Sequence, residues 1–454
     1  MTLLGSRPVA LGAALALVAA CAAPAAAHAH RPAQAAAAGA VYFISPTGDD
    51  AAAGTKSSPW ASIERAQEAV GPGDTVYLRG GTYAYDDALR DCSSQTDRVE
   101  VVALAVDGTD DHPITYAAYQ DETPVLDFSG VLDDCRIKGI SITADWLVIE
   151  GLEVTGVRQN NSLNNESWGI WISGSHNLVD EVDTHHHMGP GLFISAGGGN
   201  TVRDTDSHDN YDPFSKSGAG QNADGFGMHT AADGLAQTVF EGCRAWSNSD
   251  DGWDLINAAS PVLIDRSWAW LSGYLPDGSH EPAPAGNGNG FKAGGYGGEW
   301  EEPSAVHTVQ RSVAFGNRNA GFYANHHTVA NVFVNNTAFD NRQDYNMLGV
   351  APDGTDIGIG QLRNNVSYSA GGNRWLDGTD SASNTWDLGI ALTDADFLSV
   401  SATGWDAPRK PDGSLPALTH LRPSADGALI DAGVDVGLPY TGAAPDLGAF
   451  ESEG

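Results

Sequence analysis

The feature that most constrains the fold of this chain is a glycine-punctuated strand that recurs six times between residues 167 and 325. Its copies read SWGIWIS, GPGLFIS, NADGFGM, SDDGWDL, GNGFKAG and NAGFYAN. The shared glycines are Gly169, Gly191, Gly225, Gly252, Gly290 and Gly321, at intervals of 22, 34, 27, 38 and 31 residues. Unequal intervals between equivalent strands are typical of a solenoid with loops of different lengths. The repeat therefore predicts an all-β fold, a parallel β-helix.

When the six copies are aligned on their glycines, equivalent residues form the columns of the alignment. Neighbouring parallel strands lie about 4.8 Å apart, so the residues of one column are expected to be neighbours in the structure. Two of these columns are polar. In coil order they read Asp224, Asp251 and Asn289 just before the glycine, and Asp254, Lys292 and Tyr323 two residues after it. Asp250 adds a fourth acid at the turn. We therefore expect four carboxylates and one lysine to gather on adjacent coils, with the lysine exposed in a groove.

Carboxylates stacked this closely repel one another, so they need a cation or a shared proton. A set of oxygen ligands from Asp224, Asp250, Asp251 and Asp254 favours Ca²⁺. Zinc more often recruits histidine or cysteine, and Mg²⁺ keeps more of its waters. The alternative is a solvated, aspartate-rich turn region, which has no need of a lysine beside it. Asn289 and Tyr323 are the candidates for contact with a substrate.

The first 29 residues have the pattern of an export signal: Arg7, an apolar run over residues 9–20, and small residues up to the cleavage region. Cleavage would release the protein outside the cell, whereas the residues before Cys21 also resemble a lipoprotein box that would acylate this cysteine. An alanine-rich linker follows over residues 30–40. The rest of the chain has no stretch of roughly 20 apolar residues, so we expect no membrane span.

Composition restricts the possible partners. The chain has 58 acidic and 23 basic residues, a formal net charge of −35, which makes it a poor partner for nucleic acid. An acidic polysaccharide would have to be received through bound cations.

Among the remaining cysteines, we expect Cys92 to pair with Cys135 and Cys243 to be a buried free thiol.

The repeat favours one domain over residues 41–454, and we expect a monomer. A short amphipathic helix after Pro59 is predicted to cap the open end of the solenoid. The catalytic coils are expected over about residues 147–370, where a second segment recurs and ends in Asn210, Asn248, Asn317 and Asn341. These asparagines predict a structural ladder. Residues 371–454 are expected to form a C-terminal cap. The histidines at 185–187 are interpreted as solvated turn residues.

The combination of ADGF, SDDGWD and GFK with the opening YFISPTGDD and the turn GDTVYLRGGTY resembles the family 9 polysaccharide lyases. This resemblance covers most of the mature chain. It implies a secreted pectate lyase on a right-handed parallel β-helix, with Asp224, Asp250, Asp251 and Asp254 holding a catalytic Ca²⁺ and Lys292 acting as the base. The loops over residues 212–221 and 276–286 are places where the groove of this chain could differ from the family.

The implied reaction is β-elimination, in which a base removes the proton at C5 of a uronate and Ca²⁺ acts on the adjacent carboxylate. Three alternatives remain. The first is a lyase for another uronate polymer such as alginate. The second is an inverting polygalacturonase, which needs two carboxyl groups about 6.5–9.5 Å apart. The third is a carbohydrate-binding β-helix without catalytic activity, which would not require Lys292.

Overall fold

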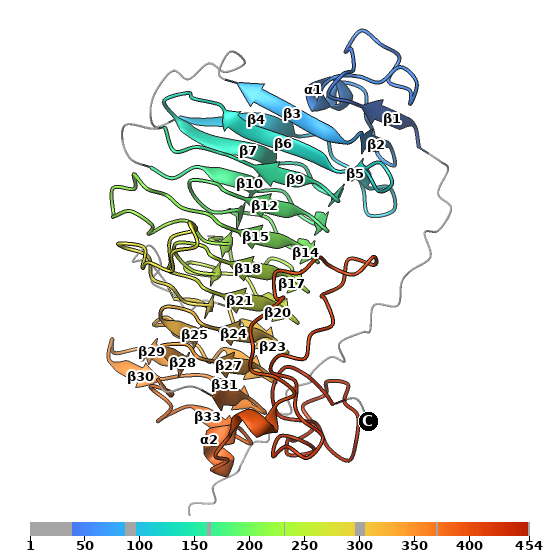
Figure 1. Ribbon diagram of the computed structural model, residues 1–454. Helices are drawn as coiled ribbons and strands as arrows, with labels where there is room; N and C mark the ends of the chain where they lie inside the picture. The colour runs from blue at the N-terminus through green and yellow to red at the C-terminus, as the bar shows by residue number, and fades with distance from the viewer. Residues whose placement is uncertain are drawn as a thin grey trace, which may run out of the picture.

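The computed structural model describes residues 39–86, 97–160, 165–230, 232–295, 305–368 and 371–452. Within these ranges the chain winds into stacked coils, and most coils contribute one strand to each of three long parallel sheets (Figure 1). The predicted parallel β-helix is confirmed. The export signal, Cys21 and nearly all of the alanine-rich linker lie outside the described residues.

In the described part of the chain, the three sheets have twelve, nine and ten strands. Sheet 1 comprises β1 (Val41–Ile44), β2 (Thr75–Leu78), β5 (Ile114–Ala118), β8 (Leu147–Glu150), β11 (Leu178–Asp180), β14 (Thr201–Arg203), β17 (Thr238–Glu241), β20 (Val262–Asp265), β23 (Thr308–Gln310), β26 (Val332–Val334), β31 (Gln361–Arg363) and β33 (Asp380–Ala382). Sheet 2 comprises β4 (Arg98–Leu104), β7 (Arg136–Ile142), β10 (Trp168–Ile172), β13 (Leu192–Ile194), β16 (Phe226–Met228), β19 (Trp253–Asp254), β22 (Phe291–Lys292), β25 (Ala320–Tyr323) and β28 (Gln343–Asn346). Sheet 3 comprises β3 (Gly81–Asp86), β6 (Pro124–Gly130), β9 (Glu153–Thr155), β12 (Asp183–His185), β15 (Asp206–His208), β18 (Arg244–Trp246), β21 (Trp268–Trp270), β24 (Val313–Phe315), β27 (Thr337–Phe339) and β32 (Val366–Tyr368). A separate hairpin pairs β29 (Leu348–Val350) with β30 (Asp356–Gly358).

The second recurrent segment of the sequence contains two strands, one in sheet 1 and one in sheet 3. A residue in the left-handed region bends the chain between them in each coil. Examples are Asp204 (φ 45°), Gly242 (φ 66°) and Asn335 (φ 51°). Glycine, aspartate and asparagine tolerate this conformation better than other residues. One turn residue thus divides the second recurrent segment into two strands, so that a coil has three strands.

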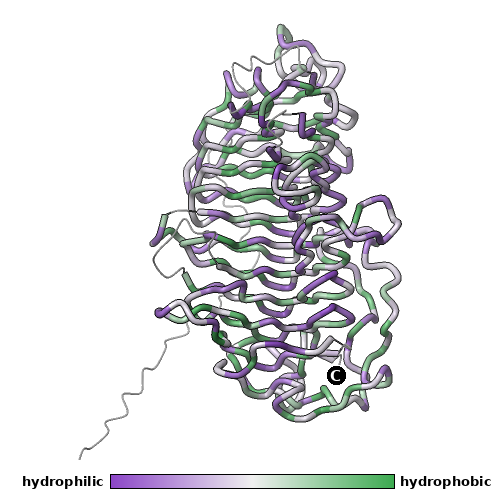
Figure 2. Tube along the Cα trace, turned by 90° about the vertical axis from the view of Figure 1, so that its left-hand side faces the viewer, coloured by the Kyte–Doolittle hydropathy of each residue, from purple (hydrophilic) through white to green (hydrophobic). Residues whose placement is uncertain are grey.

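The shared glycines of the repeat are required by the close approach of neighbouring coils. A Cβ atom at Gly225 would lie 2.7 Å from the carbonyl oxygen of Gly252, and one at Gly252 would lie 2.5 Å from that of Gly290. Contacts below 3.0 Å with backbone would force the coils apart. The next residue of each copy points inward, where Phe226, Trp253 and Phe291 stack with ring centroids 4.8 and 4.7 Å apart. Figure 2 shows hydrophobic residues recurring in successive coils.

The predicted asparagine ladder is present. Asn210 Nδ2 donates to Asn248 Oδ1 at 2.8 Å, and Asn317 Nδ2 donates to Asn341 Oδ1 at 2.9 Å. Ser272 occupies the rung between these pairs, because its backbone N–H donates to Asn317 Oδ1. All of these side chains are buried, so the ladder satisfies polar groups in the turns that lead into sheet 2.

Both ends of the solenoid are covered. The predicted N-terminal helix is α1 (Ile63–Gln67), and Ser62 caps it by accepting a hydrogen bond from the Arg65 N–H. At the other end, α2 (Thr385–Leu388) and the 3₁₀ helix η2 (Asp394–Asp396) follow the last strand. The chain then runs back along the outside of sheet 3 (Figure 1), where Arg409 Nη2 donates to Asp206 Oδ1 at 2.5 Å.

Two further predictions concern cysteines and membrane spans. Cys135 is disulfide-bonded, and Cys243 is a buried free thiol as expected. Cys92, the predicted partner of Cys135, lies outside the described residues. Among the described residues, no helix has the length and apolar character needed to cross a membrane.

Candidate active site

The column two residues after the glycine lies in or directly beside the strands of sheet 2, and the column before the glycine lies in the turns that lead into them. Strand pairing aligns Gly227 with Asp254, Asp254 with Lys292, and Lys292 with Tyr323. In the column before the glycine, the N–H of Gly225 donates to the Asp251 carbonyl and that of Gly252 to the Asn289 carbonyl. The acids, the lysine and the two predicted substrate contacts are therefore brought together on four consecutive coils, those of β16, β19, β22 and β25.

Three of the acids form a compact cluster. Asp224, Asp250 and Asp251 each place one carboxylate oxygen within 4.8 Å of the other two, and all three side chains are buried. Asp224 Oδ1 accepts from the Asp251 N–H at 3.1 Å, which fixes the two coils relative to each other. Asp250 Oδ1 accepts from the Asn287 N–H at 2.5 Å.

Asn289 is buried and bonded to the cluster. Its backbone N–H and its Nδ2 both donate to Asp251 Oδ1, at 2.7 and 2.8 Å. With 1% of its surface exposed, its side chain orients Asp251 in this structure and does not face the groove. Tyr323, the other predicted substrate contact, is partly exposed beside Lys292, and its hydroxyl lies 3.3 Å from His326 Nδ1.

Lys292 is held between two carboxylates. Its Nζ donates to Asp254 Oδ2 at 2.9 Å and lies 3.2 Å from Asp251 Oδ2. The expectation that this lysine is exposed is wrong, since it retains only 7% exposure. Its ammonium group contacts the carboxylates of Asp254 and Asp251, which are themselves buried.

The charged groups of the site strongly shift one another's pKa values. Burial, together with the neighbouring carboxylates, raises the pKa values of Asp224 and Asp250 well above the usual range. Burial acts in the same direction on Asp254, but Lys292 and His229 overcome it and lower the pKa of this acid. Burial lowers the pKa of Lys292, yet Asp254 and Asp251 outweigh it and raise the pKa well above its ordinary value. Burial also raises the pKa of Asp251, so the site favours the protonated form of three of its acids and of the lysine.

His229 belongs to the site, although the sequence interpretation did not include it. Its Nε2 lies 3.7 Å from Asp254 Oδ2, and its side chain is 31% exposed. It follows β16, two residues after Gly227 in the column of Asp254. Because side chains alternate along a strand, this spacing was the available signal.

The cluster fits a hard divalent cation. Asp224, Asp250 and Asp251 offer only oxygen ligands, and the buried Asp251 Oδ2 has Lys292 Nζ as an ion-pair partner at 3.2 Å but no well-directed hydrogen bond among the described residues. A metal ion would offset the desolvation cost of buried carboxylate oxygens that are bonded this incompletely. Asp254 lies next to this cluster but is engaged by Lys292 and by the Ile256 N–H.

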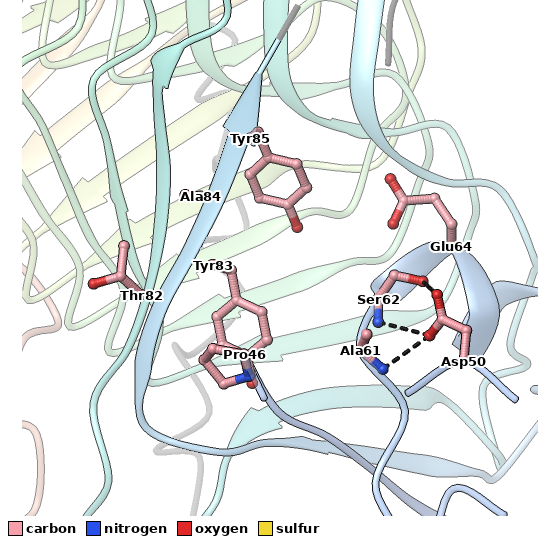
Figure 3. A pocket seen from close by; sticks show the side chains of 9 residues that line it. All are labelled: Pro46, Asp50, Ala61, Ser62, Glu64, Thr82, Tyr83, Ala84 and Tyr85. Atoms are coloured by element: carbon pink, nitrogen blue, oxygen red, sulfur yellow. Dashed lines mark hydrogen bonds between the residues drawn. The ribbon is translucent and has the colours of Figure 1, made fainter. Parts of the chain in front are cut away.

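Two other candidate sites have structural explanations. His187 is buried and interacts with Thr184 and with the Val157 N–H, so its interpretation as a solvated turn residue is wrong. A hollow of about 500 Å³ lies at the N-terminal cap, where Tyr83 and Tyr85 face α1 (Figure 3). Two carboxylates line it, Asp50 and Glu64, and Asp50 already accepts three hydrogen bonds from the capping turn.

Fold and site together define a β-helical protein with clustered carboxylates and a buried lysine on one sheet. A family model described as "Pel9A-like, right handed beta helix region" matches residues 42–365. The chain belongs to this family of right-handed β-helices, and it is a polysaccharide lyase. The predicted family, handedness and enzyme class are thereby confirmed.

Individual relatives cover nearly the whole chain. Pectate lyase L of Dickeya dadantii (strain 3937) is 35% identical over 419 residues, which is 90% of each chain. Pectate lyase PEL9 of Emericella nidulans is 29% identical over 418 residues, 87% of this chain and 94% of that one. The crystal structure of pectate lyase Pel9A covers 92% of this chain and 98% of its own, with a TM-score of 0.76 and 34% identity. The structure of a rhamnogalacturonan lyase covers 86% and 97%, with a TM-score of 0.77 and 32% identity.

Proposed function

We propose that this protein is a calcium-dependent pectate lyase that cleaves polygalacturonate by β-elimination, with Lys292 as the general base. The observation that carries the proposal is the contact of Lys292 Nζ with Asp254 and Asp251, beside a buried cluster of three carboxylates. The pectate lyases among its relatives support the choice of substrate.

Asp224, Asp250 and Asp251 would hold the calcium ion, with Asp254 as a fourth acid at the edge of the site. When bound, calcium supplies a Lewis acid for the uronate carboxylate, whose charge otherwise opposes loss of the C5 proton. Asn289 keeps Asp251 in place through its two hydrogen bonds. The ion would also offset the negative charge that raises the pKa of Lys292.

Lys292, with its amine in the neutral form, would then accept the C5 proton. The electrons of the C5–H bond form the C4–C5 double bond, and the bond from C4 to the glycosidic oxygen breaks. The leaving oxygen takes a proton from water. Asp254 fixes the position of Nζ through the 2.9 Å hydrogen bond, and His229 Nε2 lies 3.7 Å from the same carboxylate oxygen. A base held in place before the reaction loses less entropy in reaching the transition state.

A lyase acting on rhamnogalacturonan is the second candidate, because the structure of a rhamnogalacturonan lyase matches this chain with a TM-score of 0.77, against 0.76 for Pel9A. An inverting hydrolase fits the site less well, because the base it requires is a carboxylate, while here a lysine occupies the centre of the carboxylates. A purely carbohydrate-binding β-helix would not require a buried lysine.

One assay separates these functions. The protein is incubated with polygalacturonate or with rhamnogalacturonan, in excess calcium or in chelator, and the ultraviolet absorbance of the unsaturated product is followed. We expect calcium-dependent absorbance on polygalacturonate. New reducing ends without absorbance would indicate a hydrolase, and absorbance on rhamnogalacturonan alone would indicate the second candidate. We also propose that the protein is exported and acts outside the cell, as residues 1–29 predict.

A further inference from the structure

The column of Lys292 continues along sheet 2 for three more coils. Strand pairing aligns Lys292 with Tyr323 and Tyr323 with Asn346, and an isolated parallel bridge aligns Asn346 with Arg374. The Arg374 N–H donates to the Tyr345 carbonyl at 2.8 Å, and the Met347 N–H donates to the Arg374 carbonyl at 3.1 Å. Residues in one column of a parallel sheet point to the same face, so Arg374 lies about 14 Å from Lys292 along the active-site face.

Exposure increases along this column. Lys292 is buried, Tyr323 and Asn346 are partly exposed, and Arg374 is exposed. Within the described ranges, no ion pair joins Arg374 to a carboxylate, whereas Arg203 and Arg311 each contact an aspartate on an adjacent coil. In a chain with a net charge of −35, an exposed guanidinium without a carboxylate partner is a suitable contact for an external anion.

The catalytic centre cannot provide that contact for a whole polymer. It holds four aspartates and one lysine, so its own field repels a polyanion. A polyuronate carries a carboxylate on every sugar, and each sugar beyond the reacting one meets this field. A linear pyranose chain advances per sugar by a distance comparable with the strand spacing. A substrate lying along the solenoid would therefore place successive sugars over successive coils.

We propose that Arg374 binds the carboxylate of a uronate residue about three sugars away from the reacting one. Tyr323 and Asn346 line the positions between, and the polysaccharide crosses β22, β25 and β28 parallel to the solenoid axis; β25 and β28 are labelled in Figure 1. This inference rests on the proposed function, because it assumes an anionic substrate whose reaction occurs at Lys292.

The test compares Arg374→Ala and Arg374→Lys with the wild-type protein on polygalacturonate and on trigalacturonate, in excess calcium. A charge-assisted hydrogen bond corresponds to roughly a tenfold change in affinity or more. We expect the KM of Arg374→Ala for the polymer to rise by about this factor, with little change in kcat and with kcat/KM for trigalacturonate unchanged. Arg374→Lys should recover part of the loss, because it keeps the charge.

Lys410→Ala is the matched control, because Lys410 is an exposed cation on the C-terminal segment. It should leave both substrates unaffected. A wild-type KM of Arg374→Ala for the polymer would overturn the inference, and so would an equal loss on both substrates. These results differ from failure of the proposed function, in which the wild-type protein itself releases no unsaturated product from polygalacturonate.

Discussion

Replacing Lys292 by alanine tests the ion pair, the metal site and the base together. The substitution removes the ammonium group that contacts Asp254 and Asp251, and both carboxylates are buried. Removing one partner of a buried ion pair costs about 3–5 kcal/mol, because a buried charge is left without compensation. Since whole domains are stable by only about 5–15 kcal/mol, the effect should be large in the calcium-free protein.

Calcium should reduce this loss. An ion that binds the folded state at a hundred times its Kd adds about 2.7 kcal/mol, and the site without Lys292 has more uncompensated negative charge with which to bind it. We therefore expect Lys292→Ala to lower the free energy of unfolding by about 3–5 kcal/mol in chelator and by clearly less in excess calcium. Urea unfolding followed by tryptophan fluorescence measures both values.

The same variant should lose activity even when calcium keeps it folded. A general base contributes about 10²–10⁴-fold to the rate, so we expect less than about one hundredth of the wild-type rate on polygalacturonate. Lys410→Ala again provides the control for loss of a cation. Retention of more than a few per cent of the wild-type rate would refute the role of Lys292 as base. Unchanged stability in chelator would refute the reasoning from the buried ion pair.

Three further predictions concern the metal site, pH and the ladder. Asp251→Asn should weaken calcium binding in calorimetry and lower activity in parallel, because it removes one anionic ligand; normal calcium affinity would remove Asp251 from the ligand set. Burial opposes the charge on His208, but hydrogen bonds to Asp183 and Asp209 raise its pKa to about 9. Its stabilising contribution, at most about 3 kcal/mol, is thus complete below about pH 6.5 and is lost as pH rises through 9, so His208→Gln should be less stable than wild type at pH 6 but not at pH 10. Asn248→Ala should lower the free energy of unfolding by about 1–3 kcal/mol in urea titrations, because it removes the oxygen that accepts from both the backbone N–H and the Nδ2 of the buried Asn210; a neutral effect would contradict the ladder's structural role.

The sequence by itself determined the stacking and its register. Gly225, Gly252 and Gly290 mark equivalent places because any side chain there would collide with the next coil, so counting from them aligns Asp254 with Lys292 correctly. The capping helix is encoded locally by its N-cap serine, and the asparagine ladder is visible as a residue type that recurs at equivalent positions, although its hydrogen bonds join neighbouring coils. A repeated sequence pattern can be recognised without information about contacts between distant residues.

Only the tertiary structure decided the features that depend on several coils at once. Lys292 is buried while its ammonium group is paired with both Asp251 and Asp254. The sequence of one strand does not reveal this double ion pair, because the partners lie on a neighbouring coil. Arg374 joins the active-site column through an isolated bridge, in a segment where the repeat has faded and cannot be counted. The return of the C-terminal segment onto sheet 3, through Arg409 and Asp206, joins residues about 200 positions apart. Local patterns specify which residues are equivalent, whereas exposure and long-range pairing are set by everything that packs around them.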